Sequence, residues 1–170
     1  RVYHTKPTYQ TVLDAVTKQF HSGEGAIQFA PEAIARSNAD ILKDDELRKE
    51  FIEIYSEQGK DEARNWINSS YGPFSEEELD HRMSRYGLNP CGEILGNDFH
   101  CNLAEVHLNQ IDPGNFEEQK KAFKAAALSV ACLLNHEFEV ERYRKSREYD
   151  PIVGVSFTGL FDFCVHAFGT

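Results

Sequence analysis

The chain has 170 residues and carries 28 acidic against 18 basic side chains, which gives a formal net charge of −10 at pH 7. This length fits one domain with a buried core, while the acidic balance argues against a nucleic-acid surface, which needs a basic face. The longest strongly apolar stretch, residues 125–134, has about half the length of a membrane span. We therefore expect neither nucleic acid nor a membrane as a partner.

The first 88 residues are predicted to be mainly helical. Apolar residues at helical spacing predict a helix over residues 8–21, which Gly23 ends. A short apolar run bounded by glycines predicts a strand over residues 25–29. A capping box at Ser75 opens a helix that is expected to reach residue 86, with Gly87 as its stop. Further helices are predicted over residues 31–36, 43–58 and 61–68, and the charges of residues 40–60 predict a solvated helical face.

The second half alternates between strands and helices. Residues 90–95 are predicted to be extended or a loop, 96–98 a turn and 101–108 a strand. A long helix over residues 116–137 is apolar almost all round, so it should pack against a sheet. A second helix over 138–147 and a buried strand over 152–157 follow. Strands separated by long helical crossovers predict an α/β fold with parallel strands.

The four cysteines are Cys91, Cys101, Cys132 and Cys164. None forms a C-x-x-C pair, which argues against a structural zinc site, and we predict no metal. A chain of this size does not need disulfide staples, so a reducing intracellular setting is favoured. Cys132, on the apolar helix, and Cys164, after the last strand, are expected to be structural.

Cys91 lies between Pro90 and Gly92, in a tight loop rather than on the core face of a helix. A buried structural thiol is one interpretation, because most free cysteines are structural. A hydrolase nucleophile is another, and it needs a histidine base. Histidines occur at positions 81, 100 and 107, but their spacing brings none of them to Cys91. Spacing alone therefore leaves a structural and a catalytic role open.

Asn89 and Glu93 lie two residues before and after Cys91. In an extended loop all three side chains would project to the same side. A carboxylate beside a thiol raises the thiol pKa, which does not suit a thiolate nucleophile. A sulfur that reacts as a neutral radical fits better, with Glu93 taking a proton from a substrate hydroxyl and Asn89 holding the group in place. A surface carboxylate that caps a backbone turn is the alternative for Glu93.

The run Asn89-Pro90-Cys91-Gly92-Glu93 resembles the finger loop of class II, adenosylcobalamin-dependent ribonucleotide reductases. In that family the loop crosses the inside of a ten-stranded α/β barrel. Pro90 and Gly92 favour class II, because class I relatives usually carry leucine before the radical cysteine. Three further segments are similar to barrel strands of the family and occur in the family order: residues 22–29, 101–106 and 154–160.

The resemblance implies that residues 1–170 are a single, helix-rich segment of the catalytic barrel, truncated at both ends. Cys91 would be the thiyl radical that takes the 3′ hydrogen of a ribonucleotide, and Glu93 would deprotonate the 3′ hydroxyl. Asn89 would hydrogen-bond in the same cluster. Cys101 would be one of two redox-active thiols that supply electrons and end as a disulfide. The activity would be that of a cytoplasmic ribonucleoside-triphosphate reductase, which makes deoxyribonucleotides for DNA replication.

The resemblance also implies a cofactor and partners. Adenosylcobalamin would generate the radical, and the partners would be the ribonucleotide, a thioredoxin-type reductant and the remainder of the same chain. The family's second reducing cysteine lies upstream of the loop, but no cysteine precedes Cys91, and the family's carboxy-terminal cysteines are missing too. We therefore expect the segment to be inactive alone. The alternatives are a class I large-subunit segment, a non-catalytic α/β segment with structural cysteines, and a cysteine hydrolase.

Overall fold

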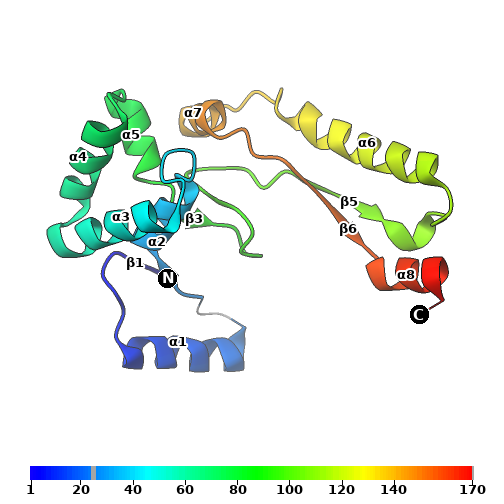
Figure 1. Ribbon diagram of the computed structural model, residues 1–170, viewed down its shortest axis with the longest axis horizontal. Helices are drawn as coiled ribbons and strands as arrows, with labels where there is room; N and C mark the ends of the chain where they lie inside the picture. The colour runs from blue at the N-terminus through cyan, green and yellow to red at the C-terminus, as the bar shows by residue number, and fades with distance from the viewer. Residues whose placement is uncertain (24–25, 170) are drawn as a thin grey trace. The chain divides into compact units, whose positions relative to one another are not determined.

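A computed structural model of the chain describes residues 1–23 and 26–169. These residues divide into two compact units, Arg1–Asn97 and Asp98–Thr170 (Figure 1). The units are considered one at a time below.

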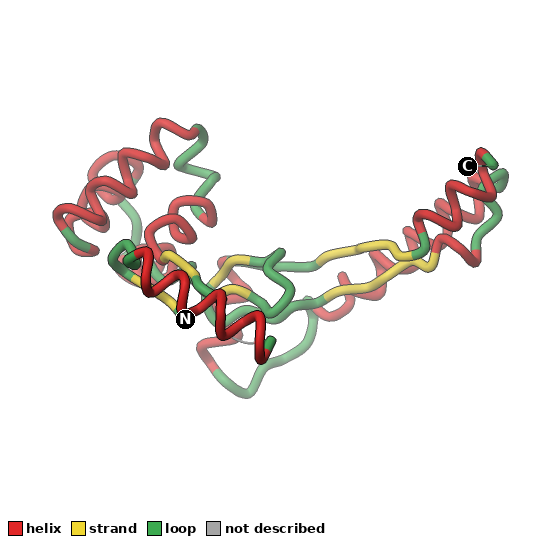
Figure 2. The backbone as a smooth tube through the Cα atoms, turned by 90° about the horizontal axis from the view of Figure 1, so that it is seen from below, coloured by secondary structure: helices red, strands yellow, loops and turns green. Residues whose placement is uncertain are grey.

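The N-terminal unit consists of five helices and four very short strands within its described residues. β1 pairs in parallel with β2, while β3 and β4 form an antiparallel hairpin (strands yellow in Figure 2). Residue 25 of the strand predicted over 25–29 lies outside the described residues, and β2 covers only the end of that range. In chain order the elements are β1 (Val2–Tyr3), α1 (Tyr9–Ser22), β2 (Gln28–Phe29), α2 (Ala30–Ser37), α3 (Asp45–Gln58), α4 (Lys60–Tyr71), α5 (Glu76–Arg82), β3 (Gly87–Leu88) and β4 (Leu95–Gly96).

The core of this unit lies among α2, α3, α4 and α5. The solvated helical face predicted from the charges of residues 40–60 is present, because most charged residues of α3 are exposed, but the same helix also buries Phe51 and Tyr55. These two aromatic residues are four apart and so share one face of the helix. The charged residues occupy the other face. The buried core residues are Ile34, Ala35, Leu42, Phe51, Tyr55, Ala63, Ile67, Leu79 and Met83.

The ends of α1 and the start of α5 follow signals in the neighbouring sequence. The end of α5 coincides with a tertiary contact. Thr8 caps α1, and Gly23 ends the helix as predicted, with a φ of 72°. The side chain of Ser75 caps α5 by accepting a hydrogen bond from the N–H of Glu78, also as predicted. However, α5 ends at Arg82, four residues earlier than predicted. The Asn38 side chain binds the Arg82 carbonyl, and Gly87 belongs to β3 instead of ending the helix.

The C-terminal unit is built on a parallel pair of strands, β5 (Leu103–His107) and β6 (Gly154–Thr158). Their register pairs Leu103 with Gly154 and His107 with Thr158. The connection between them contains a short 3-10 turn, η1 (Leu108–Gln110), and the helices α6 (Phe116–Leu133) and α7 (Glu141–Tyr149). After β6, the chain ends in α8 (Leu160–Phe168). The predicted α/β class with parallel strands is thus confirmed.

Helix α6 runs along β5 and β6 and contacts both strands (Figure 1). The prediction that this apolar helix packs against a sheet is therefore confirmed. The burial predicted for the last strand is wrong, because every residue of β6 except Gly154 is exposed. Cys132 is exposed as well, and so does not fill a core. The reason is the same in both cases: a two-stranded sheet under one helix leaves much of both elements uncovered.

The described residues form three two-stranded sheets and no closed barrel. The ten-stranded barrel therefore stays a prediction. In residues 1–23 and 26–169 no helix combines the length and the apolar character needed to cross a membrane.

Candidate functional site

The loop that contains Cys91 connects the two strands of the β3–β4 hairpin. Leu88 pairs with Leu95, and residues 89–94, here called the Cys91 loop, link them. The N–H of Gly92 donates to the carbonyl of Asn89 at 3.0 Å, which closes a four-residue turn. Asparagine first, proline second and glycine fourth is a sequence typical of such turns. Cys91 is therefore the third residue of a tight turn, and the extended conformation considered above is wrong.

The side chain of Asn89 organises this loop from inside. It is only 7% exposed, and its Oδ1 accepts hydrogen bonds from the N–H groups of Glu93 (3.1 Å) and Ile94 (3.0 Å). Its Nδ2 donates to Glu93 Oε1 at 2.5 Å. Asn89 and Glu93 therefore meet, as predicted. They meet because an asparagine side chain bonds across a turn, and strand alternation plays no part.

The two reactive groups of the loop, the Cys91 thiol and the Glu93 carboxylate, are both exposed. A ligand can therefore reach both of them. One carboxylate oxygen is held by Asn89, so the position of the carboxylate is restricted even at the surface. The loop presents a thiol and an oriented proton acceptor two residues apart on a hydrogen-bonded turn.

In the described part of the N-terminal unit, the Cys91 thiol is not hydrogen-bonded to a histidine that could act as its base. No hydrogen bond there joins Cys91 to a histidine ring, and His81 is buried in α5. A cysteine hydrolase requires a histidine base within hydrogen-bond reach of the nucleophile. The hydrolase alternative therefore gains no support from this unit.

Cys101 belongs to the C-terminal unit and is exposed. The strand predicted over residues 101–108 begins only at Leu103, so Cys101 lies two residues before β5 instead of forming part of the strand. Its proximity to Cys91 stays a prediction. Each of the four cysteines is outside any disulfide in the described residues.

His100, next to Cys101, takes part in an aromatic cluster. Its ring centroid lies 4.3 Å from that of Phe138 and 5.1 Å from that of Tyr143. In residues 1–23 and 26–169 no group of three or more His, Cys, Asp or Glu side chains is arranged to hold a metal ion. Packing between aromatic rings thus accounts for the position of His100.

Comparison of the chain with protein-family models, with curated proteins and with solved structures found no match. The case for a function therefore depends on the chemistry of the Cys91 loop itself.

Gly92 has a φ of +81°, a conformation that side chains with a Cβ rarely adopt. We expect Gly92→Ala to destabilise the closed turn by about 1 kcal/mol, because alanine is strained in the left-handed region. Faster amide exchange at Glu93 and Ile94 would report this change. Gly92→Asn is the matched variant: asparagine tolerates this region better, so its exchange rates should fall between those of glycine and alanine. Equal rates in all three proteins would contradict the assigned turn.

Proposed function

We propose that the chain supplies the radical-bearing loop of a ribonucleotide reductase. The observation that carries the proposal is the turn itself: it presents an exposed thiol at Cys91 and, two residues on, a Glu93 carboxylate of which one oxygen is held by the buried Asn89. A carboxylate at this position can accept a proton from a bound substrate. It suits a neutral sulfur that exchanges a hydrogen atom while the carboxylate exchanges a proton.

The proposed chemistry assigns one task to each group. The Cys91 sulfur radical takes the hydrogen atom from the 3′ carbon of the ribonucleotide, so an S–H bond forms as the C–H bond breaks. Glu93 takes the proton of the 3′ hydroxyl, which promotes loss of the 2′ hydroxyl as water. Two thiols, Cys101 and a second cysteine, supply two electrons and become a disulfide. The net change is one ribonucleotide and two thiols converted to one deoxyribonucleotide, one disulfide and one water.

Adenosylcobalamin is the cofactor that the resemblance to class II enzymes implies, and when bound it supplies the unpaired electron. A radical mechanism calls for a sulfur in a shielded cavity, whereas the Cys91 sulfur is exposed in this structure. The shelter would therefore have to come from the bound cofactor and the remainder of a longer chain. No described residue is assigned to hold the cobalamin. The part of this chain is to position the sulfur, since hydrogen transfer needs donor and acceptor nearly in contact.

The broader assignment follows the same resemblance. The substrates would be ribonucleoside triphosphates, the reductant a thioredoxin-type protein, the compartment the cytoplasm, and the catalytic unit would include the remainder of a longer chain. A class I large-subunit segment is the nearest alternative, since the same thiol and carboxylate would serve it. A non-catalytic segment would need neither the exposed thiol nor the oriented carboxylate.

The test uses the full-length protein with ribonucleoside triphosphates and dithiothreitol, with and without adenosylcobalamin. We expect deoxyribonucleotides only when the cofactor is present. Formation that needs a separate metal-containing subunit instead would place the chain in class I. No deoxyribonucleotide under either condition would contradict the proposed reaction.

A further inference from the structure

Asn38, the residue that follows α2, is fully buried, and its side chain uses its whole hydrogen-bonding capacity. Nδ2 donates to the carbonyl of Ile34 at 2.9 Å and to that of Arg82 at 3.1 Å. Oδ1 accepts from Nη1 of Arg82 and from Nη1 of Arg85, each at 3.1 Å. One amide therefore joins the end of α2 to the end of α5 and the residues after it.

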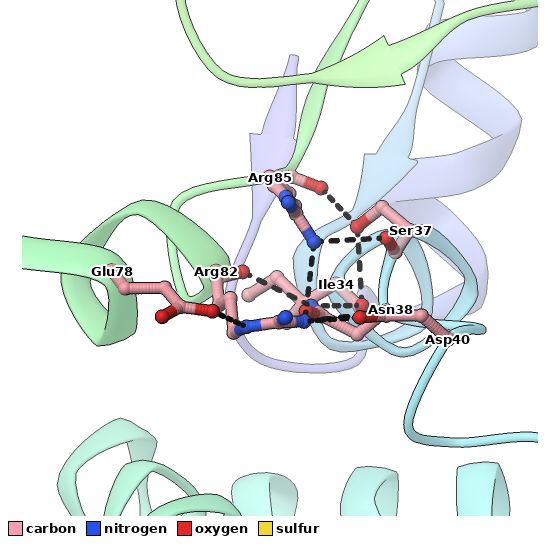
Figure 3. Close-up of polar contacts among 7 residues, drawn as sticks. All are labelled: Ile34, Ser37, Asn38, Asp40, Glu78, Arg82 and Arg85. Carbon is pink, nitrogen blue, oxygen red and sulfur yellow. Dashed lines mark hydrogen bonds and ion pairs between the residues drawn. The ribbon is translucent and has the colours of Figure 1, made fainter. Parts of the chain in front are cut away.

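The neighbours of Asn38 strengthen this junction, and Figure 3 shows the group. Nη1 of Arg82 donates to Asp40 Oδ2 at 2.9 Å, and its Nε donates to Glu78 Oε1 at 3.0 Å. The hydroxyl of Ser37 donates to the carbonyl of Arg85 at 2.8 Å. These residues are called the Asn38 cluster: Ser37, Asn38, Asp40, Glu78, Arg82 and Arg85.

Two of the carbonyls held by this cluster, those of Arg82 and Arg85, belong to the backbone that leads into the Cys91 loop. Arg85 lies two residues before β3 and four before Asn89. On the other side of the loop, β4 also contacts α2. Both strands of the hairpin that carries Cys91 are thus tied to α2, one through the Asn38 cluster and one directly.

From this arrangement we propose that Asn38 is a positioning residue for the Cys91 loop, an inference that rests on the proposed function. An apolar side chain of the same size could fill the space but could not aim at two carbonyls and two guanidinium groups. Directional bonds in a buried site have few alternative partners, so they favour one backbone path. Loss of the amide removes a hydrogen-bond partner from two guanidinium donors and from two carbonyl acceptors, which loosens the chain just before β3.

The matched pair of variants is Asn38→Leu and Asn68→Leu. Asn68 also holds backbone in the N-terminal unit, because its Oδ1 accepts from the N–H of Phe74 at 2.9 Å. The backbone that it holds precedes α5, whereas Asn38 holds the Arg82 carbonyl at the end of α5, just before β3. Amide exchange in the folded chain should become about tenfold faster at Glu93 and Ile94 with Asn38→Leu and stay unchanged there with Asn68→Leu. Unchanged exchange at Glu93 and Ile94 with Asn38→Leu, or equal acceleration by both variants, would overturn the inference.

The second measurement uses the full-length enzyme. Asn38→Leu should lower kcat by up to about 10²-fold with KM unchanged, as expected when reacting atoms are displaced without loss of substrate binding. If Asn38→Leu does not fold, Ser37→Ala removes the hydrogen bonds of one hydroxyl, to the carbonyls of Arg85 and Ile34, and should give a smaller change of the same kind. If Asn38→Leu speeds amide exchange but the unsubstituted full-length protein reduces no ribonucleotide, the structural role of Asn38 is supported and only the proposed function is contradicted. Normal kcat together with faster exchange would overturn the positioning role.

Discussion

Replacing Cys91 by serine should reduce ribonucleotide reduction by the full-length enzyme more than about 10⁴-fold, beyond what a general acid or base contributes. An oxygen–hydrogen bond is much stronger than a sulfur–hydrogen bond, so serine cannot take over hydrogen-atom transfer. Deoxyribonucleotide formation by the purified variant, measured over many hours, is the readout. Because the side chain is exposed, the substitution should leave the unfolding midpoint unchanged.

Two further variants serve as controls for this result. Cys132→Ser changes another exposed cysteine, on α6, and should retain full activity. Glu93→Gln keeps the size of the side chain and an oxygen that can accept from Asn89, but it removes the base, so the expected loss of activity is smaller, about 10²- to 10⁴-fold. Appreciable reduction by Cys91→Ser would rule out the radical role of this sulfur. Full activity of Glu93→Gln would rule out the carboxylate as the proton acceptor.

Replacing Phe51 by alanine should lower the free energy of unfolding of the N-terminal unit by about 3–5 kcal/mol. Phe51 is fully buried and lies in the middle of the helical core, where its ring faces Tyr55 and Trp66 at centroid distances of 5.9 and 6.4 Å. The loss combines the apolar transfer free energy of the ring with the cavity left behind. Urea unfolding followed by circular dichroism measures it.

The control is Phe20→Ala on α1 of the same unit. The ring of Phe20 is 85% exposed, so its removal should change the unfolding free energy by less than about 0.5 kcal/mol. Similar losses for the two variants would show that the core is not centred on α3. A loss below about 1 kcal/mol for Phe51→Ala would contradict the burial of that ring.

The sequence predicted those elements whose ends are marked locally. Thr8 and Gly23 delimit α1, and Ser75 opens α5, because each acts on residues within one turn of itself. The end of α5 could not be predicted in the same way. There the Arg82 carbonyl is bound by Asn38, which lies 44 positions away in the sequence. Sequence reasoning missed Asn38 altogether, since an asparagine after a helix is an ordinary cap.

In the candidate site, too, contacts within one short segment could be predicted and contacts between distant segments could not. The Asn89–Glu93 contact was predictable, because both residues belong to one short turn. Its cause was misjudged, since a proline and a glycine beside Cys91 favour a turn over an extended chain. Cys101 could be named as a candidate from the resemblance, but spacing within a sequence does not determine whether residues of two compact units meet. That question depends on packing, which no local pattern encodes.

The pairing of β5 with β6 has a thermodynamic consequence. Its register joins Leu103 to Gly154, so the chain must close a loop of about fifty residues before the first ladder bond forms, whereas the β3–β4 hairpin closes over seven or so. Loop-closure entropy grows with the logarithm of length, which makes the longer closure costlier by about 2 kcal/mol. We expect the packing of α6 along both strands to offset this extra free energy of loop closure, in addition to the hydrogen bonds between the strands. Substitutions that weaken this helix should therefore separate two strands whose own residues remain untouched.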